Sequence, residues 1–158
     1  MVKIGIVDFD TSHVVAFTQR INHVGVDSDQ WVNGAKVTVG CPGKSLLSPE
    51  RIPGFTQQMQ EYGVPLVDTP EEIIGQVDAV MIESVDGSVH YDRTLPFLEA
   101  GIPVFIDKPL TCSLEHAKAL VDLARNRGIP IFSSSSLRYA LEVTNIQKDQ
   151  NGVGQVVG

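Results

Sequence analysis

The chain has 158 residues, of which 42% are hydrophobic, so it is long enough for one domain that buries a sizeable core without cross-links. Its net charge of −7 and the scatter of its 12 lysines and arginines exclude a basic surface for nucleic acid. The first apolar run is too short for a signal peptide or a membrane span, so we expect a soluble, cytoplasmic protein without membrane partners.

Short apolar runs rich in β-branched residues alternate along the chain with segments of helical period. The runs predict five buried strands: Val2 to Val7, Lys36 to Gly40, Val77 to Ile82, Val104 to Ile106 and Pro130 to Phe132. The intervening segments predict helices: Ser12 to Val24, Gly54 to Tyr62, Pro70 to Ile74, Ser88 to Ala100 and Ser113 to Arg127. This alternation predicts an α/β fold, a doubly wound parallel sheet with Rossmann-like topology in a single domain.

The helix ends carry their own signals. Ser113 is a suitable N-cap for the last of these helices, and Gly128 is a suitable residue to end it. Pro96 lies inside the preceding helical segment, where we expect a kink or a late helix start because proline lacks the backbone N–H.

An acid, a lysine and a proline follow the fourth predicted strand. Asp107 and Lys108 would lie at the carboxyl end of that strand, where open α/β sheets bind their ligands. Pro109 restricts the backbone just after Lys108, so the ammonium group would project from a fixed point. The alternative is a surface lysine after an edge strand. Ser133 to Ser136 follow the next strand and would either line a ligand cleft with hydroxyls or form a simple loop.

In combination these segments resemble the Gfo/Idh/MocA oxidoreductases over nearly the whole chain. Asp107, Lys108 and Pro109 match the Glu-Lys-Pro signature of that family, with the acid shorter by one methylene. His90 matches a histidine usual in the preceding helix, and Arg138 with Tyr139 resembles an arginine–aromatic pair after the sixth family strand.

The resemblance implies the nucleotide-binding domain of an NAD- or NADP-dependent oxidoreductase that acts on a small-molecule sugar, cyclitol or related alcohol. Lys108 would be the electrostatic or acid–base group with His90 as the other catalytic residue, and Asp107 would orient Lys108 or touch the ribose. The cofactor-binding residues that we expect are Asp8, Asp10, Thr11, Ser12, His13, Glu83, Ser84, Asp107, Lys108, Pro109 and Arg138.

Two departures from the family pattern concern the cofactor. A dinucleotide-binding turn has the form Gly-x-Gly-x-x-Gly, but Asp8, Asp10 and His13 occupy the glycine positions, which argues against ordinary NAD binding. No carboxylate follows the second predicted strand to bind the adenosine ribose. Lys44 and Ser45 could instead bind the 2′-phosphate of NADP, although the surrounding sequence lacks the spacing of a P-loop.

These departures leave two alternatives open. One is a non-catalytic module that binds a sugar or a nucleotide in the same cleft. The other is a metal-dependent enzyme that uses acids and histidines expected at the carboxyl edge of the sheet: Asp8, Asp10, His13, Glu83, Asp86, His90 and Asp107. In the competing interpretation of that cluster, Asp10 and Ser12 simply cap the first helix, His13 packs beneath it and Glu83 is solvated. The cysteines, Cys41 and Cys112, match no metal-ligand spacing, and we expect both to be free thiols.

The C-terminal part of the chain suggests a boundary. We expect a Rossmann-like domain over residues 1–137, and over residues 138–158 a linking helix, Leu141 to Gln150, with the start of a truncated second domain. The resemblance implies that this second domain would supply an Asp and a His that work with Lys108, so a complete active site would need another chain. A homo-oligomer is possible, because the terminal segment GVGQVV could pair with the edge of a neighbouring sheet.

Overall fold

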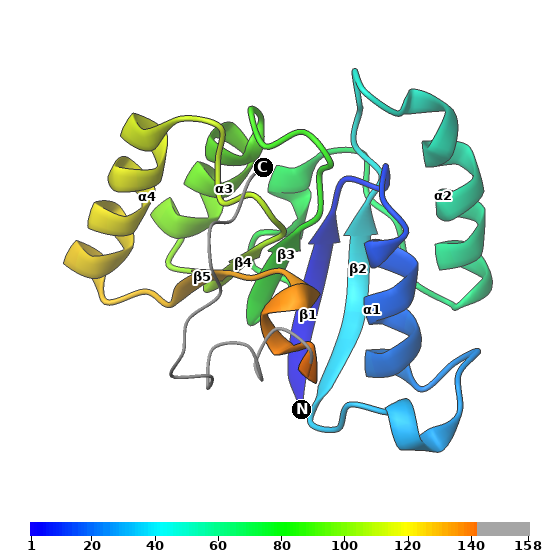
Figure 1. The fold of residues 1–158 in the computed structure, drawn as a ribbon. Coiled ribbons are helices and arrows are strands. Elements are labelled where there is room, and N and C mark those ends of the chain that lie inside the picture. The colour runs from blue at the N-terminus through cyan, green and yellow to red at the C-terminus, as the bar shows by residue number, and fades with distance from the viewer. Residues whose placement is uncertain (142–158) are drawn as a thin grey trace, which may run out of the picture.

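Five parallel strands form one sheet in the order β2-β1-β3-β4-β5, as seen in a computed structural model that describes residues 1–141 (Figure 1). The strands are β1 (Val2–Val7), β2 (Ala35–Cys41), β3 (Ala79–Ile82), β4 (Val104–Ile106) and β5 (Ile131–Ser133). All five predicted strands are therefore confirmed, as is the doubly wound parallel sheet. The predicted linking helix from Leu141 and the terminal strand fall, apart from Leu141 itself, outside the described residues.

Four α-helices connect the strands: α1 (His13–Asn22), α2 (Ile52–Glu61), α3 (His90–Glu99) and α4 (Leu114–Arg127). The segment expected as a helix after residue 70 is a 3-10 turn, Pro70–Ile73. Helix α3 begins at His90, later than expected, and continues through Pro96. Among these described helices none is both long and apolar enough to cross a bilayer.

Helix α4 has the ends that its sequence predicts. The Ser113 hydroxyl accepts a hydrogen bond from the backbone N–H of His116 at 3.3 Å, which satisfies one of the free N–H groups of the first turn. Gly128 ends the helix with a φ of 66°, in the left-handed region that favours glycine.

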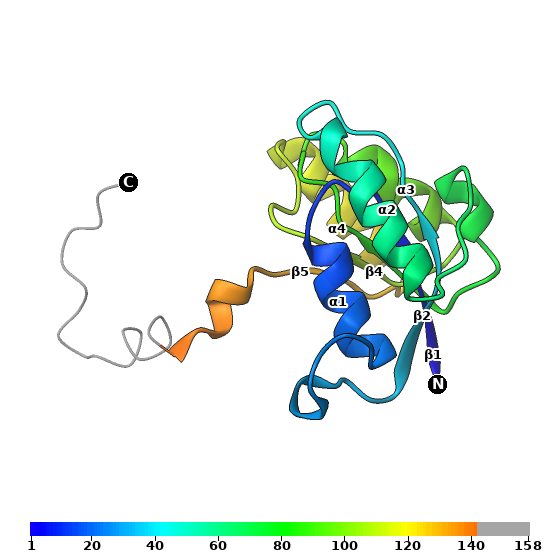
Figure 2. The same ribbon diagram turned by 90° about the vertical axis from the view of Figure 1, so that its right-hand side faces the viewer.

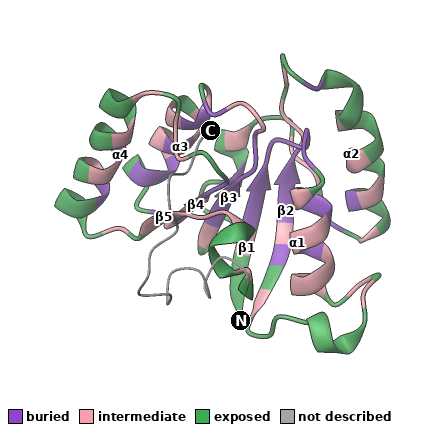
Figure 3. Ribbon diagram, viewed as in Figure 1, coloured by how far each residue is buried: buried purple, intermediate pink, exposed green. Residues whose placement is uncertain are grey.

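Helices α1 and α2 cover one face of the sheet, and α3 and α4 cover the other (Figures 1 and 2). Because side chains alternate along a strand, neighbouring strand residues belong to different cores. Val7 packs with Phe97 and Leu120 on the α3–α4 side, whereas Ile6 packs with Val14 and Met59 on the α1–α2 side. The central strands are buried on both faces, which produces a three-layer α/β/α domain (Figure 3).

Strand β2 contains a bulge that changes which face its side chains reach. Ile4 pairs with Val37 and Gly5 pairs with Val39, so Thr38 is an extra residue in the ladder. Val37 consequently packs on the α1–α2 side and Val39 on the α3–α4 side, although they are two residues apart. The bulge precedes the carboxyl end of β2.

The chain reverses its direction across the sheet beside β1. It passes from β1 to β2 on one side, and then crosses back over β1 to β3 on the other side. An isolated parallel bridge between Gly40 and Leu66 extends the sheet beyond β2. In open α/β sheets the ligand crevice lies at the carboxyl ends of the strands beside such a reversal. The loops after β1, β3 and β4 are therefore where a functional site is expected.

Candidate functional site

The turn after β1 has the backbone bend of a Gly-x-Gly-x-x-Gly turn, although it contains none of the three glycines. Asp8 has a φ of 66°, a conformation that glycine adopts readily and that aspartate tolerates better than most residues. Its backbone N–H donates to the carbonyl of Cys41 at 2.9 Å, and the N–H of Phe9 donates to the carbonyl of Pro42 at 2.9 Å. The turn is thus tied to the loop that follows β2.

The Asp8 carboxylate points into the protein. Its Oδ2 atom accepts hydrogen bonds from Nε of Arg93 at 2.9 Å and from the hydroxyl of Ser84. The residue is only 2% exposed, and burial raises the pKa of Asp8 in spite of these partners. Gly43 lies so close that a Cβ atom there would be 1.8 Å from Oδ1 of Asp8. Glycine at position 43 therefore makes room for this carboxylate.

The remaining residues of the turn are held within the protein. Oδ1 of Asp10 accepts a hydrogen bond from the N–H of Val85 at 3.0 Å, and the hydroxyl of Thr11 accepts one from the N–H of His13 at 3.3 Å. Ser12 is the N-cap residue of α1, but its side chain makes no capping bond. The interpretation in which Asp10 and Ser12 cap the first helix is therefore wrong, because Asp10 is turned towards the loop after β3.

Three of the expected site residues meet between α1 and the ends of β3 and β4. Nδ1 of His13 lies 2.6 Å from Oδ2 of Asp107, while Oδ1 of Asp107 accepts the backbone N–H of Lys108 at 2.8 Å. Glu83 is fully buried beside them, so the interpretation in which it is solvated is wrong. Neither of its carboxylate oxygens has a hydrogen-bond partner among the described residues. Burial raises the pKa of Glu83 well above its usual range, and the charge of Asp107 adds to the effect.

His90 is buried with both ring nitrogens engaged. Nδ1 lies 2.7 Å from the carbonyl oxygen of Pro109 and Nε2 lies 2.8 Å from that of Ser84, and the residue is 0% exposed. His90 thus joins the loop after β3 to the segment after β4. The structure does not place it against the open part of the crevice, where a substrate would contact it. Gly87 lies against the same segment, and a Cβ there would be 2.6 Å from Cγ of Pro109.

Lys108 is exposed at the mouth of a hollow of about 500 Å³. His13, Asp107 and Lys108 line this hollow, and the other lining residues are Ala16, Phe17, Arg20, Ser134, Ser135, Ser136 and Leu137. The serines that follow β5 therefore line a cleft, as one of the two interpretations of their sequence expected. Arg138 is exposed and is not one of the residues that line it.

A second hollow lies on the other side of the turn after β1. It has a volume of about 320 Å³ and is lined by Gly43, Lys44, Asp68, Thr69, Pro70, Glu71 and Arg93. Lys44 follows β2, where the adenosine part of a dinucleotide is bound in Rossmann domains.

Buried acids dominate the region between the two hollows. Asp8, Asp10, Glu83 and Asp107 are all buried, and Arg93 is paired with Asp8. A pyrophosphate carries negative charge, so these carboxylates would repel it unless they are neutralised. The charge of this region is thus a feature that a bound anion would have to overcome. Asp86 lies apart from the buried acids: its Oδ1 accepts the N–H of Ser88 at 2.8 Å, and hydrogen bonds from Ser88 lower the pKa of Asp86.

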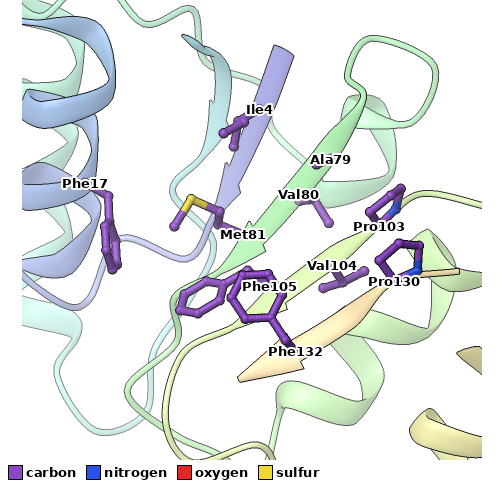
Figure 4. Close-up of a pocket in the computed structure, with 10 residues that line it drawn as sticks. All are labelled: Ile4, Phe17, Ala79, Val80, Met81, Pro103, Val104, Phe105, Pro130 and Phe132. Atoms are coloured by element: carbon purple, nitrogen blue, oxygen red, sulfur yellow. The ribbon is translucent and has the colours of Figure 1, made fainter. Parts of the chain in front are cut away.

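An apolar hollow of about 300 Å³ lies on the α1 side of the sheet (Figure 4). Phe17, Phe105 and Phe132 reach it from α1, β4 and β5, and the rings of Phe105 and Phe132 are 5.0 Å apart. Its lining contains no titratable side chain. We therefore assign the chemistry of the domain to the polar crevice.

Three residues that shape the crevice were not predicted from the sequence. Arg93 is 85 positions from Asp8, and no local pattern connects the two. Gly43 and Gly87 are required by close approach to Asp8 and Pro109, which only the folded chain brings about. Both cysteines are free, as expected, with Cys41 buried and Cys112 exposed.

Comparison with protein families gives a match over more than half of the chain. Residues 48–134 match the model of an oxidoreductase family with an NAD-binding Rossmann fold, the GFO_IDH_MocA family. A 1,5-anhydro-D-fructose reductase of Ensifer adhaerens is 32% identical over 113 residues, which are 70% of this chain and 34% of the relative. An inositol 2-dehydrogenase of Corynebacterium glutamicum is 27% identical over 128 residues, 79% of this chain and 37% of that protein. The matched part of the chain therefore spans little more than a third of these relatives.

Solved structures with the same fold include two proteins of low sequence identity. A dehydrogenase of Clostridium difficile superimposes with a TM-score of 0.71 at 15% identity, covering 94% of this chain and 44% of its own. A biliverdin reductase of Synechocystis, solved with biliverdin and NADP+, gives a TM-score of 0.70 at 20% identity, covering 98% of this chain and 44% of its own. These similarities confirm the Rossmann-like fold.

Proposed function

Because this chain belongs to the Gfo/Idh/MocA family of oxidoreductases with an NAD-binding Rossmann fold, we propose that it binds NAD or NADP for an oxidoreductase that acts on a sugar, cyclitol or related alcohol. The observation that carries this proposal is the position of Lys108, which lies two residues after the end of β4 and lines a hollow together with serine hydroxyls. We assign the cofactor-binding domain to residues 1–137 and the start of a second domain to residues 138–158.

The two hollows suggest how an extended cofactor would be held. Lys44 would contact the adenosine half, and Ser134, Ser135 and Lys108 would surround the nicotinamide half. The nicotinamide ring, when bound, supplies the hydride acceptor or donor of the reaction. Thr11 and Ser12 lie between the hollows at the start of α1, where Rossmann domains bind the pyrophosphate.

Lys108 is suited to act on an alcohol that enters the larger hollow. Its ammonium group can stabilise negative charge that develops on the reacting oxygen and can exchange a proton with it. His90 would act as a positioning residue, because its bond to the carbonyl of Pro109 fixes the segment that carries Lys108. Asp107 holds the same segment through the backbone N–H of Lys108.

Calorimetric titration of the 158-residue chain with NAD(H) and NADP(H) tests the cofactor assignment. We expect saturable binding with a dissociation constant on the order of 10 μM. Lys44→Ala should weaken NADP(H) binding about tenfold and leave NAD(H) binding unchanged if Lys44 contacts the 2′-phosphate. Absence of binding to either cofactor by a chain that circular dichroism shows to be folded would contradict the assignment and favour a module that binds another ligand.

Lys108→Ala tests the assignment of the reacting group. Oxidation of sugars and cyclitols by a protein that joins this domain to the substrate domain of a relative, followed by the absorbance of the reduced cofactor, should slow by about 10²- to 10⁴-fold, as expected for loss of an acid–base group. The dissociation constant of the cofactor should change by less than about threefold. Lys118→Ala, an exposed lysine in α4, is the control. Unchanged turnover in Lys108→Ala would show that another group performs this step.

A further inference from the structure

Glu83 differs from the other buried acids of the described residues, because its carboxyl group has no hydrogen-bond or ion-pair partner. Asp8 has Arg93 and Ser84, Asp10 has the N–H of Val85, and Asp107 has His13 and the N–H of Lys108. Glu83 is 0% exposed, and both of its oxygens lack a partner among the described residues. A buried carboxyl without a partner is costly, and such groups commonly indicate a missing ion or water.

The fold brings two further ligand atoms to Glu83. Strands β3 and β4 are neighbours with Ile82 opposite Ile106, so Glu83 and Asp107 leave the sheet side by side. His13 begins α1, which packs over the same part of the sheet through the contact of Phe17 with Phe105. One ligand atom each from His13, Glu83 and Asp107 lies within 4.8 Å of the other two.

We propose that His13, Glu83 and Asp107 bind one divalent transition-metal ion. One imidazole nitrogen and two carboxylate oxygens are ligands suited to Mn²⁺, Fe²⁺ or Zn²⁺. A charge of +2 balances the two carboxylates and supplies the partner that Glu83 lacks. Nδ1 of His13 and Oδ2 of Asp107 lie 2.6 Å apart, which is a hydrogen-bond distance, so a bound ion would replace the proton between these two atoms and move them apart.

The site is open on one side. His13 and Asp107 line the larger hollow, whereas Glu83 lies buried behind them. Three protein ligands leave coordination positions free, and these face the hollow that also contains Lys108 and the serine hydroxyls. Hydroxyl oxygens on adjacent carbons of a polyol are suitable ligands for these positions; this extension rests on the proposed function, whereas metal binding itself does not.

The sequence suggested seven acids and histidines as metal ligands. In the structure, four of them have other hydrogen-bond or ion-pair partners. Asp8 is paired with Arg93, Asp10 accepts the N–H of Val85, and Asp86 accepts that of Ser88. Both ring nitrogens of His90 lie against carbonyl oxygens. The remaining three form the proposed site.

Titration with metal in the absence of cofactor and substrate tests the proposal. The 158-residue chain, freed of metal with EDTA and dialysed, would be titrated calorimetrically with Zn²⁺, Mn²⁺ and Mg²⁺ in separate experiments. We expect one Zn²⁺ or Mn²⁺ per chain with a dissociation constant of about 10 μM or lower, and weaker binding of Mg²⁺, which prefers oxygen ligands. Bound metal should also raise the thermal unfolding midpoint, because it binds the folded chain.

Variants of the ligands identify the site. Glu83→Gln and His13→Asn should each weaken Zn²⁺ or Mn²⁺ binding by about tenfold or more. The matched controls, Glu115→Gln and His116→Asn, change exposed residues of α4 and should leave it within about twofold. Since His13 is partly exposed, His13→Asn should fold even if Glu83→Gln does not. Substoichiometric binding to a folded chain, or binding that both ligand variants retain, would overturn the proposal.

Addition of a polyol distinguishes the metal site from its proposed use. Electron paramagnetic resonance of bound Mn²⁺ should change when inositol is added if hydroxyl oxygens enter the coordination sphere. A spectrum that inositol leaves unchanged would overturn the polyol extension while the metal site stands. Metal binding without any NAD(H) or NADP(H) binding would support the site and contradict the cofactor assignment, so the two proposals can fail separately.

Discussion

Asp8 retains the backbone shape of a nucleotide-binding turn but places a negatively charged side chain in a position that is normally glycine. Its positive φ preserves the bend, and its carboxylate occupies the space left by Gly43. Among residues 1–141, the charged partner of this carboxylate is Arg93, whose side chain is 29% exposed. The stability of the turn therefore depends on Arg93 of α3, which is 85 positions away from Asp8 in the sequence.

Replacement of Arg93 by methionine should lower the free energy of unfolding by roughly 3 kcal/mol at neutral pH, because it leaves a buried carboxylate unpaired. The charge and hydrogen bond of Arg93 lower the pKa of Asp8, so their loss raises that pKa further. The folded chain then binds a proton that the unfolded chain has released above about pH 4. Stability of the variant should consequently fall as pH rises, and the loss should be larger at pH 8 than at pH 5.

Urea denaturation at both pH values measures this difference. Arg125→Met is the control: Arg125 forms an exposed pair with Asp122 at 3.6 Å, and its loss should change stability by less than about 0.5 kcal/mol. An effect of Arg93→Met that is equal at the two pH values would contradict the role assigned to Asp8.

At the scale of elements, the segment after β4 is positioned by the loop after β3. His90 binds the carbonyl of Pro109, and the N–H of Cys112 donates to the carbonyl of Gly87 at 3.2 Å. Gly87 packs directly against Pro109 and Cys112. Lys108 thus projects from a segment whose position is determined by two loops.

Gly87→Ala should disturb this arrangement. The new Cβ would lie 2.6 Å from Cγ of Pro109 and 3.0 Å from Sγ of Cys112, so the segment must shift. We expect a loss of about 1–3 kcal/mol in unfolding free energy, together with slower turnover in the oxidoreductase assay. Gly54→Ala in α2 is a matched control, since a Cβ there meets nothing within 4 Å and alanine favours the helix. If the two variants unfold at the same urea concentration, Gly87 does not constrain the segment.

At the scale of the whole molecule, the sheet contributes side chains to both hydrophobic cores. Met59 of α2 lies in the core on the α1–α2 side, and Leu120 of α4 lies in the core on the other side. Both cores include side chains from β1, β2 and β3, so loss of packing on one face weakens the other. The two layers of helices should therefore unfold together with the sheet.

Met59→Ala and Leu120→Ala should each lower the unfolding free energy by about 2–5 kcal/mol, because both side chains are fully buried. Urea transitions followed by far-ultraviolet circular dichroism and by the fluorescence of Trp31, the single tryptophan, should coincide in both variants. Transitions that separate in one variant would show that its layer unfolds independently.

The sequence by itself was sufficient to predict the architecture. The runs over residues 4–7 and Val104–Ile106 are apolar throughout, because parallel strands are buried on both faces, and Ser113 and Gly128 indicate the ends of α4. The Asp107–Lys108–Pro109 segment was likewise located at the end of a strand from local pattern alone. These features depend on neighbours in the chain, which a sequence displays directly.

Only the tertiary structure decided which polar residues meet. Glu83, Asp107 and His13 come from three separate segments, and their assembly depends on the order of β3 and β4 and on how α1 packs over them. The same packing pairs Asp8 with Arg93 and turns His90 away from the open crevice. Such contacts between distant segments follow from strand order, helix packing and close approach at Gly43 and Gly87, none of which has a local signal in the sequence.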